Sequence, residues 1–332
     1  MSESIPPTLL SIIERLKLAK RAAIFTHQRP DPDALGSQVA MAHILKQLGA
    51  KDVRAMQFAP PPKQYEFLLK SSGVTSDEWS SEWAGSEGGL IDTIVVVDTC
   101  TYSQMEPVTT FLKAERHKIV AIDHHQSRDE IGPLLYSDTK AAACVEILWE
   151  IAKAAGLKID EAMAFPLMAG LVSDTGWFRF DSVTARTHAM AADLTPLVNN
   201  ALLYEKLMQT ETKPKLGLMQ RALASMQWSA GDRFACMSLT PHDFSETGAT
   251  QSQTEYLVDM PLTIQTVEVV ALLTEMADGR VRGSLRSKRD VDVNAICRQF
   301  GGGGACEGGG VADGWASGGS AGEDYGGSGG GD

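Results

Sequence analysis

Apolar and polar positions alternate in a regular order along the first half of the chain. Short apolar runs rich in β-branched residues end in polar residues, and segments with helical periodicity follow them. This order is typical of a parallel sheet with crossover helices. The runs predict strands at Ala22–Thr26, Asp52–Gln57, Thr93–Asp98 and Lys118–Ile122, and helices at Leu35–Leu48, Ala141–Ala155 and Asp160–Val172. The sequence therefore predicts an N-terminal α/β domain over residues 1–193.

The second half of the chain has a different pattern. The strand pattern stops near Leu194, and a mostly helical stretch over residues 194–228 predicts a connector. A smaller α/β domain is expected over residues 229–304, with strands at Phe234–Leu239, Val267–Glu275 and Arg280–Leu285 and a helix near Val293–Phe300. Residues 305–332, called the C-terminal tail below, are rich in Gly and Ser and lack apolar periodicity. Such composition predicts disorder.

Composition narrows the class of protein without identifying it. The 332 residues are 43% hydrophobic and 22% charged, as in ordinary soluble domains, and no apolar run is long enough to span a membrane. The five cysteines are scattered, and the N-terminus lacks a signal-peptide pattern, so we expect reduced thiols and a cytoplasmic protein. A net charge of −12 argues against binding long nucleic acid. A small anionic ligand remains compatible, because bound cations can reverse the charge of one site.

Acidic and histidine side chains gather at the ends of four predicted elements. They are His27, Asp31 and Asp33 in FTHQRPDPDALGS, Asp98 in TIVVVDT, Asp123, His124 and His125 in IVAIDHHQS, and Asp174 in AGLVSDTG. In an open α/β sheet, the carboxyl ends of the strands form the crevice where ligands bind. Taken singly, some of these residues have a structural explanation. The Asp-Pro-Asp turn could cap the helix that follows it, and Asp98 alone could cap the helix after its own strand.

Taken together, the clusters favour catalysis with metal ions. Carboxylate and imidazole groups suit hard divalent cations, and this set can supply two octahedral sites that share one carboxylate. Two such cations polarise a phosphoryl group and stabilise the leaving oxygen. The sequence has no GxxxxGK[ST], HExxH or GxSxG pattern, so a P-loop, a zincin site and a serine hydrolase are disfavoured.

The same segments resemble a known family. HQRPDPDALGS, VVVDT, IDHHQS and SDTGWFR are similar, in order and spacing, to the four motifs of the DHH phosphoesterases. GSLRSKRDVDVNAICRQFGGGG resembles the accessory DHHA1 domain, which in that family closes over the substrate. The resemblance covers roughly residues 20–304. Within the superfamily, the length and the short connector are most similar to bacterial nanoRNases that also act as pAp (3′-phosphoadenosine 5′-phosphate) phosphatases.

The resemblance implies roles for individual residues. His27, Asp31 and Asp98 would hold a first cation, and Asp33, Asp98, His124 and Asp174 a second, with Asp98 bridging. Mn²⁺ is expected, with Mg²⁺ or Co²⁺ as alternatives. In catalysis, Asp98 would act with Asp123, which orients a neighbouring imidazole, and with His125, which contacts the phosphate or assists proton transfer. Substrate contacts are expected from Ser37, Arg179, Arg286, Ser287, Gly301, Gly302, Gly303 and Gly304.

The implied reaction is attack of a metal-bridging hydroxide on phosphorus. It would release nucleoside monophosphates from short oligoribonucleotides, or phosphate and AMP from pAp. Alternatives in the same superfamily are a cyclic or linear dinucleotide phosphodiesterase, a single-strand exonuclease, and a pyrophosphatase, which would need a different C-terminal domain. A non-catalytic nucleotide-binding regulator is the alternative of another class. The resemblance further implies a small nucleotide partner, no membrane and a homodimer.

The chain departs from the family pattern after the glycine run. A His normally follows the glycines there, but Gly304 is followed by Ala305, Cys306 and Glu307. Reading the codons of residues 305–311 one base later permits His, Ala or Val, Lys or Arg, Ala, Ala and Gly, which restores the motif. We therefore hypothesise a one-base insertion in the glycine codons. The alternative is a genuine divergent tail, in which case the metal site would survive while substrate affinity falls.

Overall fold

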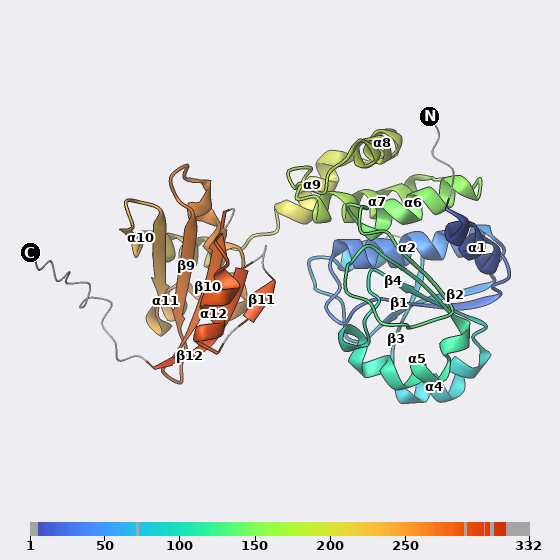
Figure 1. Ribbon diagram of the computed structural model, residues 1–332, viewed down its shortest axis with the longest axis horizontal. Coiled ribbons are helices and arrows are strands. Elements are labelled where there is room, and N and C mark those ends of the chain that lie inside the picture. Colours follow the sequence, from blue (N-terminus) through green and yellow to red (C-terminus); the bar gives the residue numbers. More distant parts are fainter. Residues whose placement is uncertain (1–5, 71–72, 289–290, 302, 306–308, 317–332) are drawn as a thin grey trace, which may run out of the picture. The chain divides into compact units, whose positions relative to one another are not determined.

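The computed structural model describes residues 6–70, 73–288, 291–301, 303–305 and 309–316, and Figure 1 shows their secondary structure. The chain divides into two compact units, Met1–Thr210 and Glu211–Asp332. The predicted connector over residues 194–228 therefore spans the boundary between the units instead of forming a segment of its own. Its helices are divided, with α9 (Asn200–Met208) in the first unit and α10 (Lys213–Ala224) in the second.

The first unit contains a six-stranded sheet in which all neighbouring strands run parallel. Its order is β3-β2-β1-β4-β5-β6, with bounds Thr75–Glu78, Asp52–Gln57, Arg21–Phe25, Thr93–Val97, Ile119–Asp123 and Leu134–Ser137. The predicted parallel sheet is confirmed. The two edge strands, β3 and β6, were not predicted. β3 reads TSDE and carries no apolar pattern, because an edge strand can be held by backbone hydrogen bonds alone.

Helices cover both faces of this sheet, so its strands are apolar on both sides. Figure 1 shows α2 (Pro32–Gln47), α6 (Cys144–Ala154) and α7 (Glu161–Asp174) on one face, and α4 (Ser81–Ser86) and α5 (Thr109–Ala114) on the other. Side chains of β1 alternate between the two cores, with Ile24 in one and Phe25 in the other. The remaining α-helices of the unit are α1 (Pro7–Leu16), α3 (Glu66–Lys70) and α8 (Ala185–Leu194), and short 3₁₀ turns connect several elements.

The second unit is built on a smaller mixed sheet. Its order is β11-β12-β10-β9-β8-β7, with bounds Gly303–Ala305, Gly309–Ala316, Arg280–Ser287, Val269–Glu275, Phe234–Leu239 and Gln227–Ser229. Only the β8–β9 pair is parallel among the described strands of this sheet. Helices α10 and α11 (Pro241–Thr247) contribute apolar side chains to a core that they share with β8 and β9. Helix α12 (Val293–Gln299) packs against β10, β11 and β12. The predicted smaller α/β domain is confirmed.

The C-terminal tail differs in part from the sequence prediction. Residues 309–316, expected to be disordered, form β12, which pairs antiparallel with β10. Backbone N–H and C=O groups along the edge of β10 can be satisfied by a glycine-rich strand, because ladder hydrogen bonds need no apolar side chains. Apolar periodicity therefore gave no signal of this strand. Residues 306–308 and 317–332 lie outside the described residues, so the disorder predicted for them stays a prediction.

Two absences among the described residues bear on the sequence predictions. No helix in the described part of the chain is both long and apolar enough to cross a membrane. Cys100, Cys144, Cys236 and Cys297 are all free thiols, in agreement with the scattered cysteine spacing.

Candidate metal centre

The clustered polar residues lie at one edge of the parallel sheet. Strands β1, β4 and β5 are neighbours, and their carboxyl ends carry His27, Asp98 and the run Asp123, His124 and His125. Since parallel strands end at the same edge, these side chains meet although they are far apart in sequence. Two helices contribute the remaining acids to this edge. Asp31 caps the N-terminus of α2, Asp33 is its second residue, and Asp174 ends α7.

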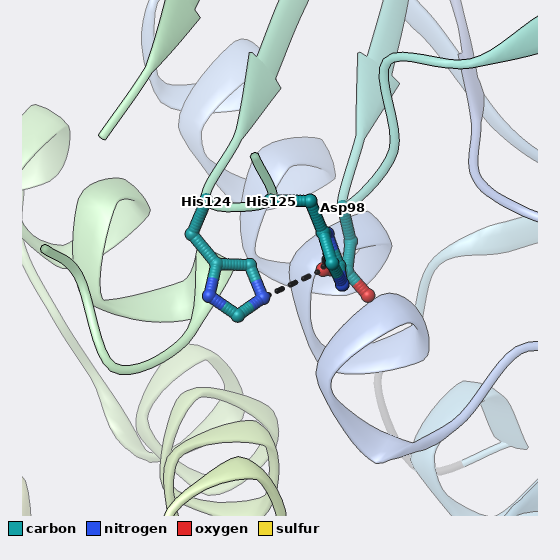
Figure 2. Close-up of side chains that lie close together, drawn as sticks. All are labelled: Asp98, His124 and His125. Carbon is teal, nitrogen blue, oxygen red and sulfur yellow. Dashed lines mark ion pairs between the residues drawn. The ribbon is translucent and has the colours of Figure 1, made fainter. Parts of the chain in front are cut away.

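Asp98 lies at the centre of the cluster and is almost fully buried. Its backbone has a positive φ of 59°, a conformation that Asp adopts more readily than most residues. One carboxylate oxygen, Oδ2, lies 3.4 Å from His27 Nε2, and the other, Oδ1, lies 3.4 Å from His124 Nε2. Figure 2 shows the His124 ring pointing toward Asp98, with this ion pair dashed. Asp98 is therefore placed to be shared between two groups of ligands.

The two adjacent histidines are oriented by different partners. His124 Nδ1 lies 3.3 Å from the carbonyl oxygen of Ala141, which can only accept, so Nδ1 carries a proton and donates it to this oxygen. Nε2 then faces Asp98 and Asp174, at 3.4 Å from an oxygen of each. His125 Nδ1 lies 2.8 Å from Asp123 Oδ1, and its side chain is 49% exposed. One imidazole thus points into the cluster, while the other is open to solvent.

Asp33 is held in place by the N-terminus of α6. Its carboxylate accepts hydrogen bonds from the amides of Cys144 at 2.6 Å and Val145 at 3.0 Å, and the side chain is fully buried. A helix N-terminus stabilises negative charge, so this contact favours the carboxylate form. Gly170 of α7 makes room for it, since a Cβ atom there would lie 2.7 Å from Asp33 Oδ1. The close packing of α2 against α7 thus depends on this glycine.

The carboxylates crowd one another electrostatically. Burial and the charge of Asp98 raise the pKa of Asp33 well above its usual range, and the pKa of Asp31 is raised for the same two reasons. Burial and the charges of Asp31 and Asp98 raise the pKa of Asp174 to about 7. These three acids therefore lack sufficient positive charge around them.

The imidazoles supply part of the missing positive charge. Burial opposes ionisation of Asp98, but the neighbouring His124 and His27 outweigh it and lower the Asp98 pKa. Burial likewise opposes protonation of His124, yet Asp98, Asp174 and Asp123 raise the His124 pKa to about 9. For His27, the proximity of Asp98 and the charge of Asp31 outweigh burial and raise the pKa. The hydrogen bond that His125 Nδ1 donates to the Asp123 carboxylate, partly opposed by burial, raises the pKa of His125.

The donor set fits divalent cations. Ligand atoms lie within 4.8 Å of one another in three groups, namely His27, Asp31 and Asp98; Asp33, His124 and Asp174; and Asp98, His124 and His125. Asp98 Oδ1 and His124 Nε2 are buried and have no hydrogen-bond partner among the described residues. Such atoms are costly to bury unless something binds them. Oxygen and imidazole ligands with excess negative charge suit Mn²⁺ or Mg²⁺.

The predicted substrate residues of the first unit have different environments. Ser37 is fully buried in α2, and its role as a substrate contact stays a prediction. Arg179 is exposed, and it follows three residues in the left-handed region, Gly176, Trp177 and Phe178. A Cβ atom at Gly176 would lie 2.9 Å from Arg179 Nε, so the arginine folds back over the glycine. Arg179 remains available for an anionic ligand.

The predicted substrate residues of the second unit lie on β10 and in the glycine run. Arg286 and Ser287 are successive strand residues, so their side chains point to opposite faces of the sheet. Ser287 Oγ donates to the Val291 carbonyl, and Arg286 Nε lies 3.4 Å from Asp259. A substrate role for Arg286 and Ser287 stays a prediction. Gly301 has a positive φ of 78°, Gly303 and Gly304 belong to β11, and Gly302 lies outside the described residues.

Several groups that shape the centre carried no local signal in the sequence. The Ala141 carbonyl and the amides of Cys144 and Val145 act through the backbone, so residue type does not reveal them. Gly170 could have been noticed as a glycine inside a helical run, where glycine disfavours the helix. Its neighbour Asp33 lies on another helix, however, and the spacing of the two residues does not indicate their contact.

Comparisons with known proteins agree with this geometry. The sequence pattern of the DHH family, N-terminal domain, matches residues 21–171, and that of the DHHA1 domain matches residues 231–313. The chain belongs to the DHH family. The DHH match covers the sheet and most of the residues at its carboxyl edge. The DHHA1 match extends beyond residue 304, where the predicted domain ended, and includes most of β12.

Curated relatives of this DHH chain align over nearly its full length. A protein of Streptococcus mutans described as a probable bifunctional oligoribonuclease and PAP phosphatase is 29% identical, with 89% of this chain and 90% of the relative covered. A bifunctional oligoribonuclease and PAP phosphatase of Bacillus subtilis is 28% identical, with 88% and 89% covered. A probable manganese-dependent inorganic pyrophosphatase of Streptococcus agalactiae is 25% identical over 52% of this chain and 54% of its own length.

A solved structure shares the fold. The crystal structure of an exopolyphosphatase-related protein from Bacteroides fragilis aligns with a TM-score of 0.79 over 98% of this chain and 94% of its own. The two sequences are 20% identical, so the likeness concerns the fold alone.

Proposed function

We propose that this DHH-family chain is a two-metal phosphoesterase that hydrolyses short oligoribonucleotides to nucleoside monophosphates, and pAp to AMP and phosphate. The observation that carries the proposal is the convergence of three ligand groups on Asp98 and His124 at the carboxyl edge of the parallel sheet. Relatives described as oligoribonucleases and PAP phosphatases, aligned over nearly the whole chain, support the choice of substrate.

Each residue of the centre has a role in this proposal. His27, Asp31 and Asp98 would hold one divalent cation, and Asp33, His124 and Asp174 would hold the other. Asp98 lies 3.4 Å from His124 and would also serve the second cation, as a bridging ligand. The bound cations would supply Lewis-acid activation of a water molecule and neutralise charge on the phosphoryl group. The relatives described as manganese-dependent favour Mn²⁺ over Mg²⁺ or Co²⁺. Asp123 fixes His125 through Nδ1, which leaves the exposed Nε2 to contact the phosphate and to give a proton to the leaving oxygen.

The surface of the chain favours a short substrate. A net charge of −12 repels a long polyanion, while a short one is attracted by the bound cations and by local cations. In the first unit, the exposed Arg179 follows Asp174 by five residues, and we propose that it contacts a phosphate of the substrate. In the second unit, we propose that Arg286 and the glycine run contribute to substrate binding. A pyrophosphatase is less favoured, because the relatives with that description match only about half of the chain.

The C-terminal tail bears on activity. We propose that a one-base insertion in the glycine codons shifts the reading frame at about residue 305. The shifted frame permits His at codon 305, and beyond codon 316 it permits good helix formers such as Leu, Glu, Lys and Met at nearly every position. In the printed frame the same segment has Gly and Ser as its main residues. Sequencing the gene tests this proposal, since codons 305–310 that cannot spell His-Ala-Lys-Ala-Ala-Gly, or its Val and Arg variants, contradict it.

A substrate panel tests the function itself. The purified chain is incubated with Mn²⁺ and, separately, pAp, an RNA dinucleotide, an RNA five-mer, a cyclic dinucleotide, a long single strand and pyrophosphate. We expect hydrolysis of pAp and of the short RNAs, and its loss in Asp98→Ala. Asp193→Asn is the matched control, because Asp193 is half-exposed and, in the part of the chain that the structure describes, its ion pair is a surface one with Lys153.

The outcomes separate the candidate functions. Preference for pyrophosphate, for the cyclic dinucleotide or for long strands would replace the proposed substrate by that one. Stoichiometric nucleotide binding without turnover would favour a regulator. If the printed chain is inactive and the shifted-frame version is active, the altered tail is the cause. If both are inactive while Mn²⁺ binds, the phosphoesterase proposal fails.

A further inference from the structure

Arg186, the second residue of α8, lies between three carboxylates that are not part of the metal centre. Its Nη1 lies 2.8 Å from Asp138 and 3.5 Å from Glu150, and its Nη2 lies 3.0 Å from Glu146. The arginine side chain is 27% exposed, whereas Glu146 is fully buried. The guanidinium therefore holds together the loop after β6, the first turns of α6 and the start of α8.

Glu146 depends on this arginine. Its Oε2 accepts the amide of Ala142 at 2.9 Å, while Oε1 has no hydrogen-bond partner among the described residues. Arg186 provides its only ion pair in the described part of the chain. Removing one partner of a buried ion pair leaves an uncompensated charge, which is strongly destabilising. Without Arg186, the Glu146 carboxylate would lose its ion pair and would move toward water, and the Ala142 amide would move with it.

The segment held by Arg186 contacts the metal centre at three points. The amide of Asp138 donates to the carbonyl of Asp123 at 3.0 Å. The carbonyl of Ala141 orients His124 through Nδ1, at 3.3 Å. The amides of Cys144 and Val145 hold the Asp33 carboxylate. Residues 138–145 thus carry backbone groups that orient two of the proposed metal ligands.

We propose that Arg186 is a positioning residue for the metal centre and acts through Glu146 and Asp138. Three carboxylates already face its guanidinium, so it is not available to a substrate phosphate, unlike the exposed Arg179. It touches none of the proposed ligands, and its effect passes through residues 138–145. The inference rests on the proposed function only in that the centre binds divalent cations.

The test measures Mn²⁺ binding by calorimetry on the full chain. Arg186→Met should weaken Mn²⁺ binding about 10- to 100-fold, the range for loss of groups that orient metal ligands. The Mn²⁺ affinity of Arg186→Lys should lie between those of the unsubstituted chain and Arg186→Met. A lysine ammonium keeps the charge, but it cannot reproduce the planar guanidinium that faces several carboxylates. Arg186→Met combined with Glu146→Gln should recover much of the affinity, since the buried charge is gone and a glutamine oxygen can still accept the Ala142 amide. Arg116→Met, at an exposed arginine of the same unit, should bind Mn²⁺ normally.

Each result decides the inference. Wild-type Mn²⁺ affinity in Arg186→Met would overturn it, and so would a double variant no better than the single one, because Arg186 would then not act through Glu146. Far-ultraviolet circular dichroism of the metal-free variants checks the fold. If Arg186→Met does not fold, the Mn²⁺ affinities of Arg186→Lys and of the double variant still test the inference. Absence of Mn²⁺ binding by the unsubstituted chain would instead overturn the proposed function, and this inference with it.

Discussion

The two sheets of the molecule bring their polar residues together in different ways. In the first unit every strand runs parallel, so the carboxyl ends of β1, β4 and β5 lie at one edge and carry residues that are distant in sequence. In the second unit most neighbouring strands are antiparallel, and the described substrate residues that we predicted come from β10, β11 and Gly301. A parallel sheet can assemble a many-ligand centre at one edge, whereas a mixed sheet presents residues mainly along single strands.

This difference predicts that substitutions in the two units will change different kinetic quantities. Changes at the edge of the first sheet should weaken metal binding and lower kcat, because the chemistry depends on the combined ligand set. Changes on β10 should raise KM and leave kcat nearly unchanged, because they remove binding that is equal in ground and transition state. The three predictions below test this division, from the largest expected effect to the smallest.

The contact between Gly170 and Asp33 gives the largest expected effect. In Gly170→Ala the new Cβ would lie 2.7 Å from Asp33 Oδ1 and 2.8 Å from Val145 Cγ1, so the ligand must shift. We expect kcat to fall about 10- to 100-fold together with Mn²⁺ affinity, as for other changes behind metal ligands. Steady-state kinetics and calorimetry measure both quantities.

Gly85→Ala is the matched control for this substitution. Gly85 also lies in a helix of the first unit, but a Cβ atom there would meet nothing within 4 Å. We expect unchanged activity, and a gain of roughly 0.5–1 kcal/mol in the free energy of unfolding if the position behaves as an ordinary helix interior. Equal kinetics in the two alanine variants would contradict the role of Gly170.

Arg286→Ala tests the second unit. The substitution removes the one charged side chain that we propose for substrate binding on β10. A hydrogen bond to a charged group contributes roughly 1.5–3 kcal/mol, so we expect KM for pAp to rise at least about tenfold, while kcat and Mn²⁺ affinity stay close to the unsubstituted values. Arg280→Ala is the control, because Arg280 is exposed and, among the described residues, its ion pair is with Asp278 in the neighbouring turn. A loss of Mn²⁺ binding in Arg286→Ala would contradict the expected division, in which the first unit binds metal and β10 contributes only to substrate binding.

The pH dependence of metal-free stability gives the smallest expected effect. The pKa of Asp174 is raised to about 7 and that of His124 to about 9, so between about pH 4 and pH 9 the folded chain binds more protons than the unfolded chain. Stability without metal should therefore fall as pH rises through this window. The lowered pKa of Asp98 acts only in acid, where its stabilisation is lost as pH falls.

Added metal should reverse this trend. Cation binding needs the deprotonated ligands, so the stabilisation by Mn²⁺ should grow with pH. Thermal unfolding in a chelator and in excess Mn²⁺, followed from pH 5 to pH 9, measures both slopes, and 1 kcal/mol corresponds to roughly 2–4 °C in a domain of this size. Parallel slopes with and without Mn²⁺ would show that the titrating carboxylates and His124 do not bind the cation.

Local sequence patterns predicted much of the architecture. The central strands were predicted because apolar β-branched runs must be buried on both faces, and the polar residues that end them indicated the functional edge. Resemblance to the DHH family assigned His27, Asp31 and Asp98 to one cation and Asp33, Asp98, His124 and Asp174 to another, and this ligand assignment stays a prediction. In the structure, ligand atoms of His27, Asp31 and Asp98 lie within 4.8 Å of one another, and so do those of Asp33, His124 and Asp174. The strands β3 and β12 were not predicted, because backbone pairing alone holds such strands and leaves no apolar pattern.

The sequence by itself determined which residue types stand at the ends of the buried strands, and with them the kind of chemistry that the edge can support. Only the tertiary structure decided which groups orient them. Ser37 is buried although its motif suggested a substrate contact, Gly170 is needed because another helix brings Asp33 against it, and Arg186 reaches the centre through a loop 48 residues earlier in the chain. These relations depend on contacts between distant segments, and local periodicity and residue type carry no record of such contacts.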